Sequence, residues 1–404
     1  MRIVHISTFV SGGAGLAAYR LHATMLKNNL DSVLYSQSYN NPNQSCFQVK
    51  ITRPKGIISR SLNYLFNKLA NIINAKYNRF SFEYHSNIRT LYRMDKFCKK
   101  NDIIILHWVA GFLDYKSFFS KIDKDSKVFI YVHDFNTIQG KLHTLFDREK
   151  IRGTSLEKIE NYYQSKKKGY YNQLNNLKII ANSSFTEKIL IQSNFFSKES
   201  IFKVQLGLPV DELKSMEKKL AKKHLGFEKH DFLILICSHN LESELKGFDR
   251  IMKIFNKFKN HPNIKFIGLG KLITDSFINK DNFFCFETWD PEFKSKLFSA
   301  SDVTFSASYE ETFGQTIIES YACSTPVIVY NNSALPELVS HHETGFIAEN
   351  DNDVIGFINL LLTDSDLKEK MNIASRNLFL MKYTSENQLN KLRELLNNKI
   401  SSKC

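Results

Sequence analysis

The sequence predicts an α/β protein made of two doubly wound parallel sheets, each in a domain of its own. Three observations support this prediction. Short apolar runs alternate with longer helical patterns along most of the chain, as in βαβ units. The alternation restarts near the middle of the chain. The length of 404 residues is enough for two domains of about 200 residues each.

The first half opens with a predicted strand, a glycine-rich turn and a helix. The strand is expected at 3–9, the Ser-Gly-Gly-Ala-Gly turn at 11–15 and the helix at 16–27. Three further strands are expected at 103–106, 128–132 and 179–181. Ser183 and Ser184, which follow the last of these, are expected to cap a helix.

The second half repeats the pattern. A strand is expected at 232–237, a helix at 248–259, and further strands at 264–267, 283–286 and 303–306. We place the boundary near Gly207, which assigns 1–205 to an N-terminal domain and 206–404 to a C-terminal domain. The last helix could cross back to the first domain. A ligand between two such domains would lie at the carboxyl ends of both sheets.

The positive charge of the chain is concentrated in its first half. The net charge is +14, from 55 basic and 41 acidic residues. Residues 1–200 hold 30 basic and 14 acidic side chains, which gives +16 and leaves −2 for the rest. Within 50–100 there are 12 basic residues, and the acids are Glu83 and Asp95 alone. This concentration predicts an anionic partner for the first half.

The segment 53–80 interrupts the alternation of strands and helices. Its apolar residues recur at spacings of three and four, among them Ile58, Leu62, Leu65 and Leu69. One interpretation is a basic amphipathic helix that lies on a membrane surface. The other is a core helix whose polar face is solvated. Both interpretations stay open.

The sequence favours the cytoplasm and gives no sign of a metal site. Its first residues lack the layout of a signal peptide, and no apolar run approaches the ~20 residues that span a bilayer. The six cysteines have neither the CxxC nor the Cys/His spacing of a zinc site.

The most informative stretch is 306–329. It reads as a strand end, a polar loop, a helix that begins near Gly314, and a strand led by Pro326. The N–H groups of Gly314, Gln315 and Thr316 at the start of a helix would face an anion, and glycine would let it approach closely. The pattern therefore predicts a phosphate cradle.

Two carboxylates flank this cradle. Glu311 comes before it and Glu319 lies inside the helix. A carboxylate can accept paired hydrogen bonds from the hydroxyls of a sugar. The alternative is that both are ordinary surface glutamates of an amphipathic helix.

This stretch resembles the retaining glycosyltransferases of the GT-B fold, family 4. Glu311 and Glu319 are separated by seven residues, Phe313-Gly314 lies between them, and Pro326-Val327-Ile328 follows. The resemblance implies two Rossmann-like domains that face each other across a cleft. It implies that Glu311 contacts the transferred sugar, that Glu319 contacts the ribose, and that the backbone from Phe313 to Thr316 binds the donor phosphates.

Lys246-Gly247 matches a second motif of the family. There the lysine neutralises the donor phosphates, so the resemblance gives Lys246 this role. Most members have an arginine about five residues earlier, where this chain has Leu241. The loop before Lys246 resembles the colanic-acid branch of surface-polysaccharide enzymes, which also lacks the arginine. The alternative is that Lys246 is one exposed lysine among many.

The first half supplies three more candidates. The resemblance implies that Gly12 and Gly13 close over the donor phosphates and that His133, at a strand end, lies near the transferred sugar. The alternative for His133 is a structural pair with Asp134. His107 and Trp108, at an equivalent strand end, are expected to line the acceptor cleft.

The function implied is transfer of a hexosyl group from a UDP- or GDP-sugar to a glycan or lipid-linked acceptor, with retained configuration and no metal. His133, Lys246 and Glu311 would be the catalytic residues. Such enzymes make bacterial O-antigen, capsule or exopolysaccharide. The basic region 50–100 would hold the protein against the anionic inner face of the plasma membrane.

Two other functions remain as alternatives. One is a nucleotide-sugar epimerase or phosphorylase, which would share the fold. The other is a basic binding protein without enzymatic activity. The chain has no RNA-binding motif or helix-turn-helix signal, so we expect no nucleic-acid partner.

Overall fold

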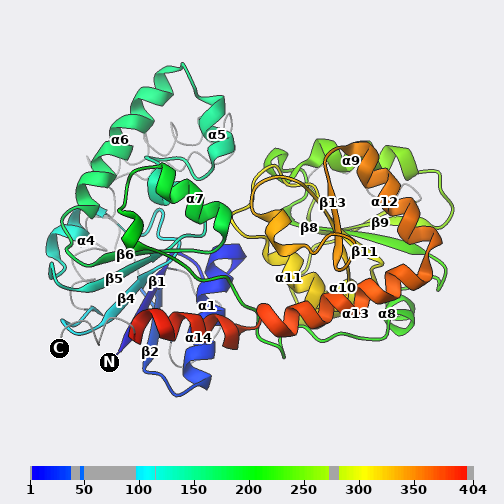
Figure 1. Cartoon of the computed structure of the whole chain (residues 1–404), viewed down its shortest axis with the longest axis horizontal. Coiled ribbons are helices and arrows are strands. Elements are labelled where there is room, and N and C mark those ends of the chain that lie inside the picture. The colour runs from blue at the N-terminus through cyan, green and yellow to red at the C-terminus, as the bar shows by residue number, and fades with distance from the viewer. Residues whose placement is uncertain (1, 38–45, 50–96, 114, 273–281, 398–404) are drawn as a thin grey trace, which may run out of the picture. The chain divides into compact units, whose positions relative to one another are not determined.

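The structure is a computed structural model that describes residues 2–37, 46–49, 97–113, 115–272 and 282–397. These residues form two units (Figure 1). Unit 1 consists of the described residues up to Gln205 together with those from Leu389 onward, and unit 2 is Leu206–Gln388. The boundary near the end of the chain falls inside helix α14 (Ser385–Asn397). Each unit is an α/β domain with one parallel sheet, which confirms the predicted fold class.

The sheet of unit 1 has seven strands in the order β3-β2-β1-β4-β5-β6-β7. All neighbouring strands pair in parallel. The strands are β1 (Ile3–Ser7), β2 (Ser32–Ser36), β3 (Cys46–Gln48), β4 (Ile103–Leu106), β5 (Lys127–Tyr131), β6 (Leu177–Ala181) and β7 (Ile201–Lys203). The chain order reverses between β1 and β4, the position where doubly wound sheets bind ligands.

The helices of unit 1 follow its strands along the chain. They are α1 (Gly12–Lys27), α4 (Tyr115–Lys121), α5 (Leu145–Lys150), α6 (Ser155–Tyr171) and α7 (Ser184–Gln192), with short 3₁₀ turns η3 (Phe135–Ile138) and η4 (Lys198–Ser200). The predicted cap is present at α7, where the hydroxyl of Ser183 accepts a hydrogen bond from the N–H of Thr186.

The sheet of unit 2 has six parallel strands in the order β10-β9-β8-β11-β12-β13. They are β8 (Phe232–Asn240), β9 (Ile264–Lys271), β10 (Phe283–Phe286), β11 (Val303–Ser306), β12 (Val327–Tyr330) and β13 (Gly345–Ala348). The order reverses between β8 and β11. The central strands are buried along most of their length, which explains their nearly continuous apolar sequences.

The helices of unit 2 begin with clear capping signals. Asp290 caps α10 (Pro291–Ala300), and Asn350 forms a capping box with Asp353 at α12 (Asp351–Thr363). The other helices are α8 (Lys218–His224), α9 (Phe248–Phe258), α11 (Gln315–Ala322) and α13 (Ser365–Lys382), with 3₁₀ turns η5 (Glu244–Lys246) and η7 (Leu335–Leu338).

The glycine-rich segment near the N-terminus is helical, so the predicted turn at 11–15 is wrong. Helix α1 already begins at Gly12. Gly15 lies where α1 passes close to the end of the first strand, and a Cβ atom there would lie 2.5 Å from the carbonyl oxygen of Phe9. Glycine is present at position 15 because this close approach leaves no room for a Cβ atom. Judged by helix propensity alone, the glycines indicated a turn.

Two strands end at residues other than the predicted ones. The strand β1 stops at Ser7 because the N–H of Thr8 turns to the carbonyl of Trp108, 2.7 Å away. The strand β8 continues past the predicted end at Cys237 to Asn240, through an irregularity in its pairing with β9.

A buried carboxylate ties several elements of unit 2 together. Asp302, which precedes β11, has 1% of its side chain exposed. Its oxygens lie 2.8 Å from Nζ of Lys222, 3.0 Å from Nζ of Lys368 and 3.0 Å from the N–H of Leu233. Burial raises the pKa of Asp302, but the nearby lysines lower it more, so the net pKa lies below the ordinary value. Asp302 therefore stays ionised.

We expect Asp302→Asn to destabilise unit 2 by about 3–5 kcal/mol, because it leaves the buried Lys222 without its counter-charge. Urea unfolding followed by Trp289 fluorescence in a Trp108→Phe background measures this loss. The difference in unfolding free energy between the native chain and Asp302→Asn should be constant above pH ~5. It should shrink below pH ~4, because the Asp302 pKa is depressed in the folded state.

The matched control is Glu292→Gln, which removes an exposed pair with Lys296 on α10. It should cost less than about 0.5 kcal/mol. Equal losses for the two variants would contradict this account of Asp302.

Candidate functional site

The loops after β8 and β11 emerge at the reversal point of the sheet of unit 2. In a parallel sheet both loops leave from the same edge, and at a reversal point they diverge to opposite sides. Here they remain joined by a backbone hydrogen bond, in which the N–H of Tyr309 donates to the carbonyl of Leu245 at 2.9 Å. The two motifs identified from the sequence lie on these two loops.

Lys246 and Glu311, 65 residues apart in the chain, form an ion pair across these loops. Their side chains are 24% and 22% exposed. The same oxygen of Glu311 also accepts a hydrogen bond from the hydroxyl of Ser308 at 3.0 Å. The structure therefore brings a cation and a carboxylate together at an accessible place, and Lys246 is not an isolated surface lysine.

Gly247 allows the two loops to approach each other. It has φ +74°, in the left-handed region, and a Cβ atom there would lie 2.1 Å from the carbonyl oxygen of Ala307. No other residue fits this position without displacing the loop after β11. Lys246 is thus held beside Glu311 by the glycine that follows it.

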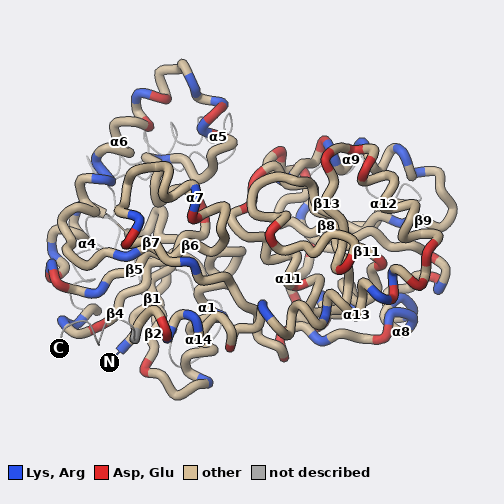
Figure 2. Tube along the Cα trace, in the orientation of Figure 1, with Lys and Arg blue, Asp and Glu red and all other residues tan. Residues whose placement is uncertain are grey.

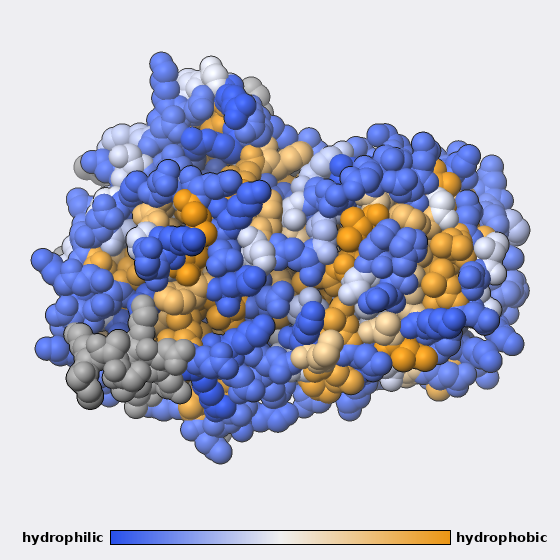
Figure 3. All heavy atoms as spheres, viewed as in Figure 1, coloured by the Kyte–Doolittle hydropathy of each residue, from blue (hydrophilic) through white to orange (hydrophobic). Residues whose placement is uncertain are grey.

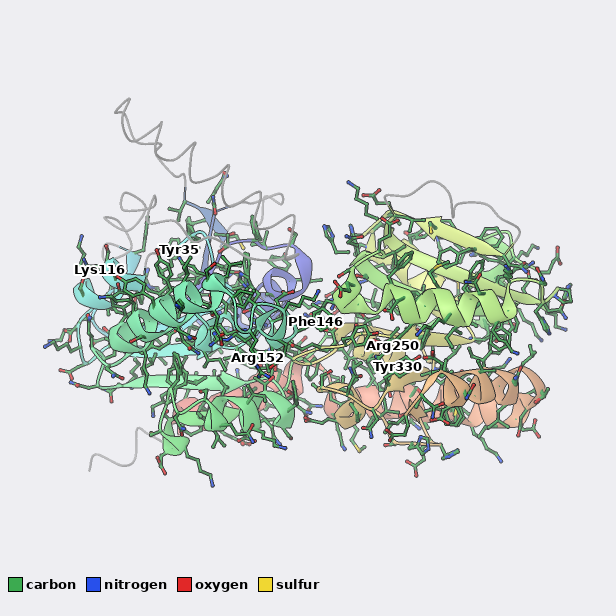
Figure 4. The ribbon with its side chains drawn as sticks, turned by 90° about the horizontal axis from the view of Figure 1, so that it is seen from above. Tyr35, Lys116, Phe146, Arg152, Arg250 and Tyr330 are labelled. Carbon is green, nitrogen blue, oxygen red and sulfur yellow. The ribbon has the colours of Figure 1, made fainter. Side chains whose placement is uncertain are left out.

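Arg250 clamps the same loop from α9. Its guanidinium lies 3.9 Å from the ring centroid of Tyr309 and 4.1 Å from that of Tyr330, and its Nη1 donates to the carbonyl of Ala307 at 3.3 Å. Arg250 and Tyr330 are labelled in Figure 4. A planar guanidinium is suited to such contacts with two rings. The sequence does not reveal this cluster, because Arg250 lies about 60 to 80 positions before its partners in the chain.

The segment after β12 holds the loop from the other side. Nδ2 of Asn332 donates to the carbonyls of Ser308 and Tyr309 at 2.9 and 2.7 Å. The hydroxyl of Ser333 accepts from the N–H of Glu311 at 3.1 Å. The sequence alone did not point to either residue. The backbone of Glu311 is therefore fixed independently of its side chain.

The predicted cradle begins at Gly314, which caps α11 and has φ +109°. The first N–H groups of a helix have no partner within the helix and carry the positive end of its dipole. Gln315 and Thr316 are half-buried at this end. The ring of Phe313 is only 2% exposed and packs against Tyr383 in the core, so the predicted role of Phe313 at the phosphates falls to its backbone and stays a prediction.

Glu319 forms a buried ion pair with Lys294 of α10. The Nζ and Oε2 atoms are 2.9 Å apart, and the side chains are 7% and 6% exposed for Lys294 and Glu319. Glu319 is thus not an ordinary surface glutamate. The sequence alone did not point to Lys294, although Asp290-Pro291 marks the helix start that places Lys294 in the first turn of α10.

Cys237 lies among the residues of both motifs. Burial is the main cause that raises its pKa to about 12. Glu319 also raises this pKa, whereas Lys294, the contact with Thr316 and Lys246 lower it. Because these groups influence one thiol, the β8 loop, α10 and the start of α11 converge there. The thiol stays protonated and is not a nucleophile at neutral pH.

Leu241 and Trp289 differ in exposure. Leu241 is 2% exposed and packs in the core of unit 2, so its side chain does not face the site. Trp289 is 44% exposed and lies near His239, with ring centroids 5.9 Å apart and planes inclined by 25°. Lys294 Nζ is 6.0 Å from the Trp289 ring, so this aromatic pair adjoins the Glu319 pair.

In unit 1, His133 and Asp134 have different partners. The Nε2 of His133 lies 2.9 Å from Nδ1 of His107. Asp134 instead bonds Nδ1 of His143 at 2.5 Å and accepts from Nε1 of Trp108 at 2.6 Å. Asp134 thus bonds His143 and Trp108 while its charge also acts on His133, so a structural pair of His133 with Asp134 remains the alternative. Gly12 and Gly13 are exposed at the start of α1, and their predicted role at the donor phosphates stays a prediction.

The described ranges hold neither a helix that could cross a membrane nor a cluster that could bind a metal. No helix there is both long and apolar enough to cross a bilayer. No cluster of three or more His, Cys, Asp or Glu side chains there could hold a metal ion. The predicted amphipathic segment 53–80 lies outside the described residues, as does almost all of 50–100.

Comparison with known families identifies the domain that holds Lys246 and Glu311. Residues 218–378 match the family model described as glycosyl transferases group 1. Most of unit 2 is therefore similar to group 1 glycosyl transferases. The matched range includes both loops, the start of α11 and Lys294, so these parts of the site all lie within it.

Two relatives and one solved structure resemble the chain. A 41.2 kDa protein of the cps region of Klebsiella pneumoniae, described as uncharacterized, is 26% identical over 360 residues, which cover 86% of each chain. The processive diacylglycerol alpha-glucosyltransferase of Acholeplasma laidlawii is 27% identical over 186 residues, covering 43% of this chain and 55% of that enzyme. Anabaena HepE in complex with UDP-glucose has a TM-score of 0.68 at 14% identity, covering 98% of this chain and 100% of that one. This likeness shows the fold, which is that of GT-B glycosyltransferases.

We expect Arg250→Lys to loosen the Glu311 loop, because lysine keeps the charge but loses the planar contact with Tyr309 and Tyr330. A loss of about 1–2 kcal/mol in local stability would speed hydrogen exchange of the Tyr309 amide roughly tenfold. Exchange measured by NMR or mass spectrometry tests this.

Arg376→Lys is the matched control, because Arg376 lies 5.2 Å from the Phe379 ring on α13 in the same unit. It should leave the Tyr309 amide unchanged. An unchanged Tyr309 amide in Arg250→Lys would refute the clamp.

Proposed function

We propose that the chain is a retaining glycosyltransferase that moves a hexosyl group from a UDP- or GDP-sugar to a hydroxyl of a glycan or lipid-linked acceptor. The pathway would be synthesis of a bacterial surface polysaccharide, such as O-antigen, capsule or exopolysaccharide. The proposal rests on the ion pair between Lys246 and Glu311. This pair lies where the strand order reverses in the range that matches group 1 glycosyl transferases.

Lys246 and the start of α11 would bind the donor diphosphate. A diphosphate would compete with Glu311 for the ammonium of Lys246, while the N–H groups of Gly314, Gln315 and Thr316 provide oriented donors. Because these groups are held by the fold before the reaction, they can stabilise the negative charge that grows on the leaving diphosphate. No metal is needed in this scheme.

Lys294 would provide the second cation of the donor site. Leu241 lies in the core and carries no charge, so it cannot be this cation. Lys294 and Lys246 both lower the pKa of the Cys237 thiol, so both cations lie near the same side chain. Its pair with Glu319 also orients that carboxylate toward the hydroxyls of a ribose. The exposed ring of Trp289, beside His239, offers a stacking surface for the base.

Glu311 would hold the transferred sugar. Its backbone is fixed by Ser333 and its carboxylate by Ser308 and Lys246, so it can accept hydrogen bonds from sugar hydroxyls in one orientation. In the reaction the bond from the anomeric carbon to the phosphate oxygen breaks and a bond to the acceptor oxygen forms on the same face. The acceptor proton passes to the leaving phosphate.

The similar proteins support the donor and the pathway. HepE was solved with UDP-glucose, the Acholeplasma enzyme is named for transfer of glucose to diacylglycerol, and the Klebsiella protein comes from a cps region. Together they favour a sugar nucleotide as donor and a lipid-linked or polysaccharide acceptor.

A peripheral position on the cytoplasmic face of the inner membrane would suit a lipid-linked acceptor. The net charge of +16 in residues 1–200 supports this, because each basic residue near an anionic surface contributes about 1 kcal/mol. Among the described helices of unit 1, α6 carries several lysines, visible in Figure 2, together with the exposed Tyr162. Hydrophilic residues cover much of the face in Figure 3, with apolar residues between them.

We expect Glu311→Gln to lower kcat/KM for transfer at least about 100-fold, because the carboxylate orients the sugar in the transition state. Release of nucleoside diphosphate from a panel of UDP- and GDP-sugars, with an extracted lipid acceptor, measures turnover. Glu310→Gln, one residue away, is the control and should retain activity. Comparable loss in both variants would contradict the role of Glu311.

We expect Lys246→Gln to weaken donor binding about 10- to 100-fold, the cost of a lost charge-assisted hydrogen bond. Isothermal titration with UDP and GDP measures it. Lys253→Gln on α9, whose side chain is 64% exposed, should bind as the native chain does. Unchanged affinity in Lys246→Gln would remove Lys246 from the donor site.

We expect the protein to sediment with vesicles that contain anionic lipid and to remain in solution with zwitterionic ones. Binding should weaken as salt is raised, because the attraction is electrostatic. Equal binding to both kinds of vesicle would refute the proposed attachment by charge.

A further inference from the structure

An exposed aromatic residue, Phe9, lies at the reversal point of the sheet of unit 1. Phe9 follows β1 and Trp108 follows β4, the two strands between which the strand order reverses. Phe9 has 41% of its surface exposed. Its ring is stacked with that of Trp108, with centroids 5.7 Å apart and planes inclined by 25°. We call these two rings the aromatic platform. It stands where doubly wound sheets bind ligands.

The backbone that carries the Phe9 ring is held on several sides. The N–H of Thr8 donates to the carbonyl of Trp108 at 2.7 Å. The hydroxyl of Ser7 donates to the carbonyl of Phe9 at 2.8 Å, and Gly15 lets α1 approach that same carbonyl. The exposure of Phe9 is therefore not that of a loose loop, because both strands and the first helix fix its position.

The indole of Trp108 is held at its edge. Nε1 donates to Oδ2 of Asp134 at 2.6 Å, and Asp134 also accepts from the N–H of Asn136 at 3.0 Å. Burial raises the pKa of Asp134, but His143 and these hydrogen bonds lower it more, so the net pKa lies below the ordinary value. The carboxylate therefore stays charged and keeps the indole in one orientation.

Phe47 shows how the aromatic platform differs from an ordinary exposed ring. Phe47 lies in β3, has 48% of its surface exposed and is 5.6 Å from the ring of Tyr35. However, β3 is an edge strand, and β2 separates it from the reversal point. Single exposed apolar residues are common on protein surfaces. Phe9 is distinguished by its place in the sheet and by the contacts that fix it.

The aromatic platform suits one face of a sugar ring. The C–H bonds on that face of a pyranose can point at an aromatic ring, whose face carries negative potential. A platform that is held in advance loses little conformational entropy when it binds. The hydroxyls of the sugar need polar partners nearby, and Ser11 supplies one. Ser11 is exposed at the start of α1, and its side chain makes no capping hydrogen bond to the described residues of that helix.

We propose that the aromatic platform binds a sugar ring of the glycan acceptor, with the ring of Phe9 against the apolar face of the sugar. This inference rests on the proposed transferase function, which needs such an acceptor. All the residues that carry it belong to unit 1. A nucleobase or a hydrocarbon could also lie on an aromatic face, so the test includes a probe of each kind.

The test is fluorine NMR of the full chain labelled with fluorotryptophan. The chain has two tryptophans, so the Trp108 signal is assigned as the one that remains in Trp289→Phe. The probes are methyl glycosides of glucose, galactose, mannose and N-acetylglucosamine, with cyclohexanol and uridine for comparison. We expect at least one glycoside to shift the Trp108 signal saturably, and cyclohexanol and uridine to leave it unchanged. No shift with any glycoside, or an equal shift with cyclohexanol or uridine, would overturn the proposal.

Three variants separate stacking from shape. Phe9→Leu keeps an apolar side chain but removes the aromatic face, so the Kd of the bound glycoside should rise about tenfold. Phe9→Tyr keeps that face and should bind nearly as the native chain does. Phe47→Leu is the matched control, because it removes an exposed phenylalanine of the same unit. Equal Kd values in Phe9→Leu and Phe47→Leu, or equal losses in Phe9→Leu and Phe9→Tyr, would contradict the stacking.

Sugar binding and sugar transfer can fail separately. A glycoside that binds the native chain, and binds Phe9→Leu about tenfold more weakly, supports the aromatic platform even if no donor is turned over. In that case only the proposed function is wrong. If transfer occurs, Phe9→Leu should raise the acceptor KM about tenfold and leave kcat and the donor KM unchanged, because the platform binds substrate and transition state alike. A native acceptor KM in this variant would overturn the role in acceptor binding.

Discussion

The site in unit 2 depends on one topological constraint, the reversal of strand order between β8 and β11 in an all-parallel sheet. The reversal places the loops after both strands at one edge, although Lys246 and Glu311 are 65 residues apart in the chain. Their ion pair alone, with both side chains about a quarter exposed, would contribute little to stability. Its position comes from the backbone around it.

Three contacts provide that position. Gly247 lets the β8 loop approach Ala307, Arg250 holds the β11 loop between two tyrosine rings, and Asn332 bonds the backbone of the same loop from β12. None of these residues needs to contact a substrate. The two charged side chains therefore remain available for ligands, because other residues hold the two loops in place.

The sequence predicted the fold well where its physical signal is local. The strands at 103–106, 283–286 and 303–306 are confirmed residue for residue, because buried parallel strands are short apolar runs with polar ends. The glycines at 12–15 were misread as a turn, since a close approach of α1 to Phe9 has no local signature. Lys246, Glu311 and Gly314 were found by motif, whereas the contacts of Lys294 and Arg250 form only when distant segments fold together. The motif around Gly314 also does not reveal that the ring of Phe313 packs in the core, because that contact with Tyr383 forms only in the folded unit.

The most direct test of the account is a crystal structure of the protein with the sugar nucleotide that most raises its melting temperature. The account predicts that the diphosphate contacts Nζ of Lys246 and the N–H groups at the start of α11, with Glu311 on the hydroxyls of the sugar and Glu319 on the ribose. A donor bound away from the edge formed by β8 and β11, or one whose sugar lies out of reach of Glu311, would contradict it.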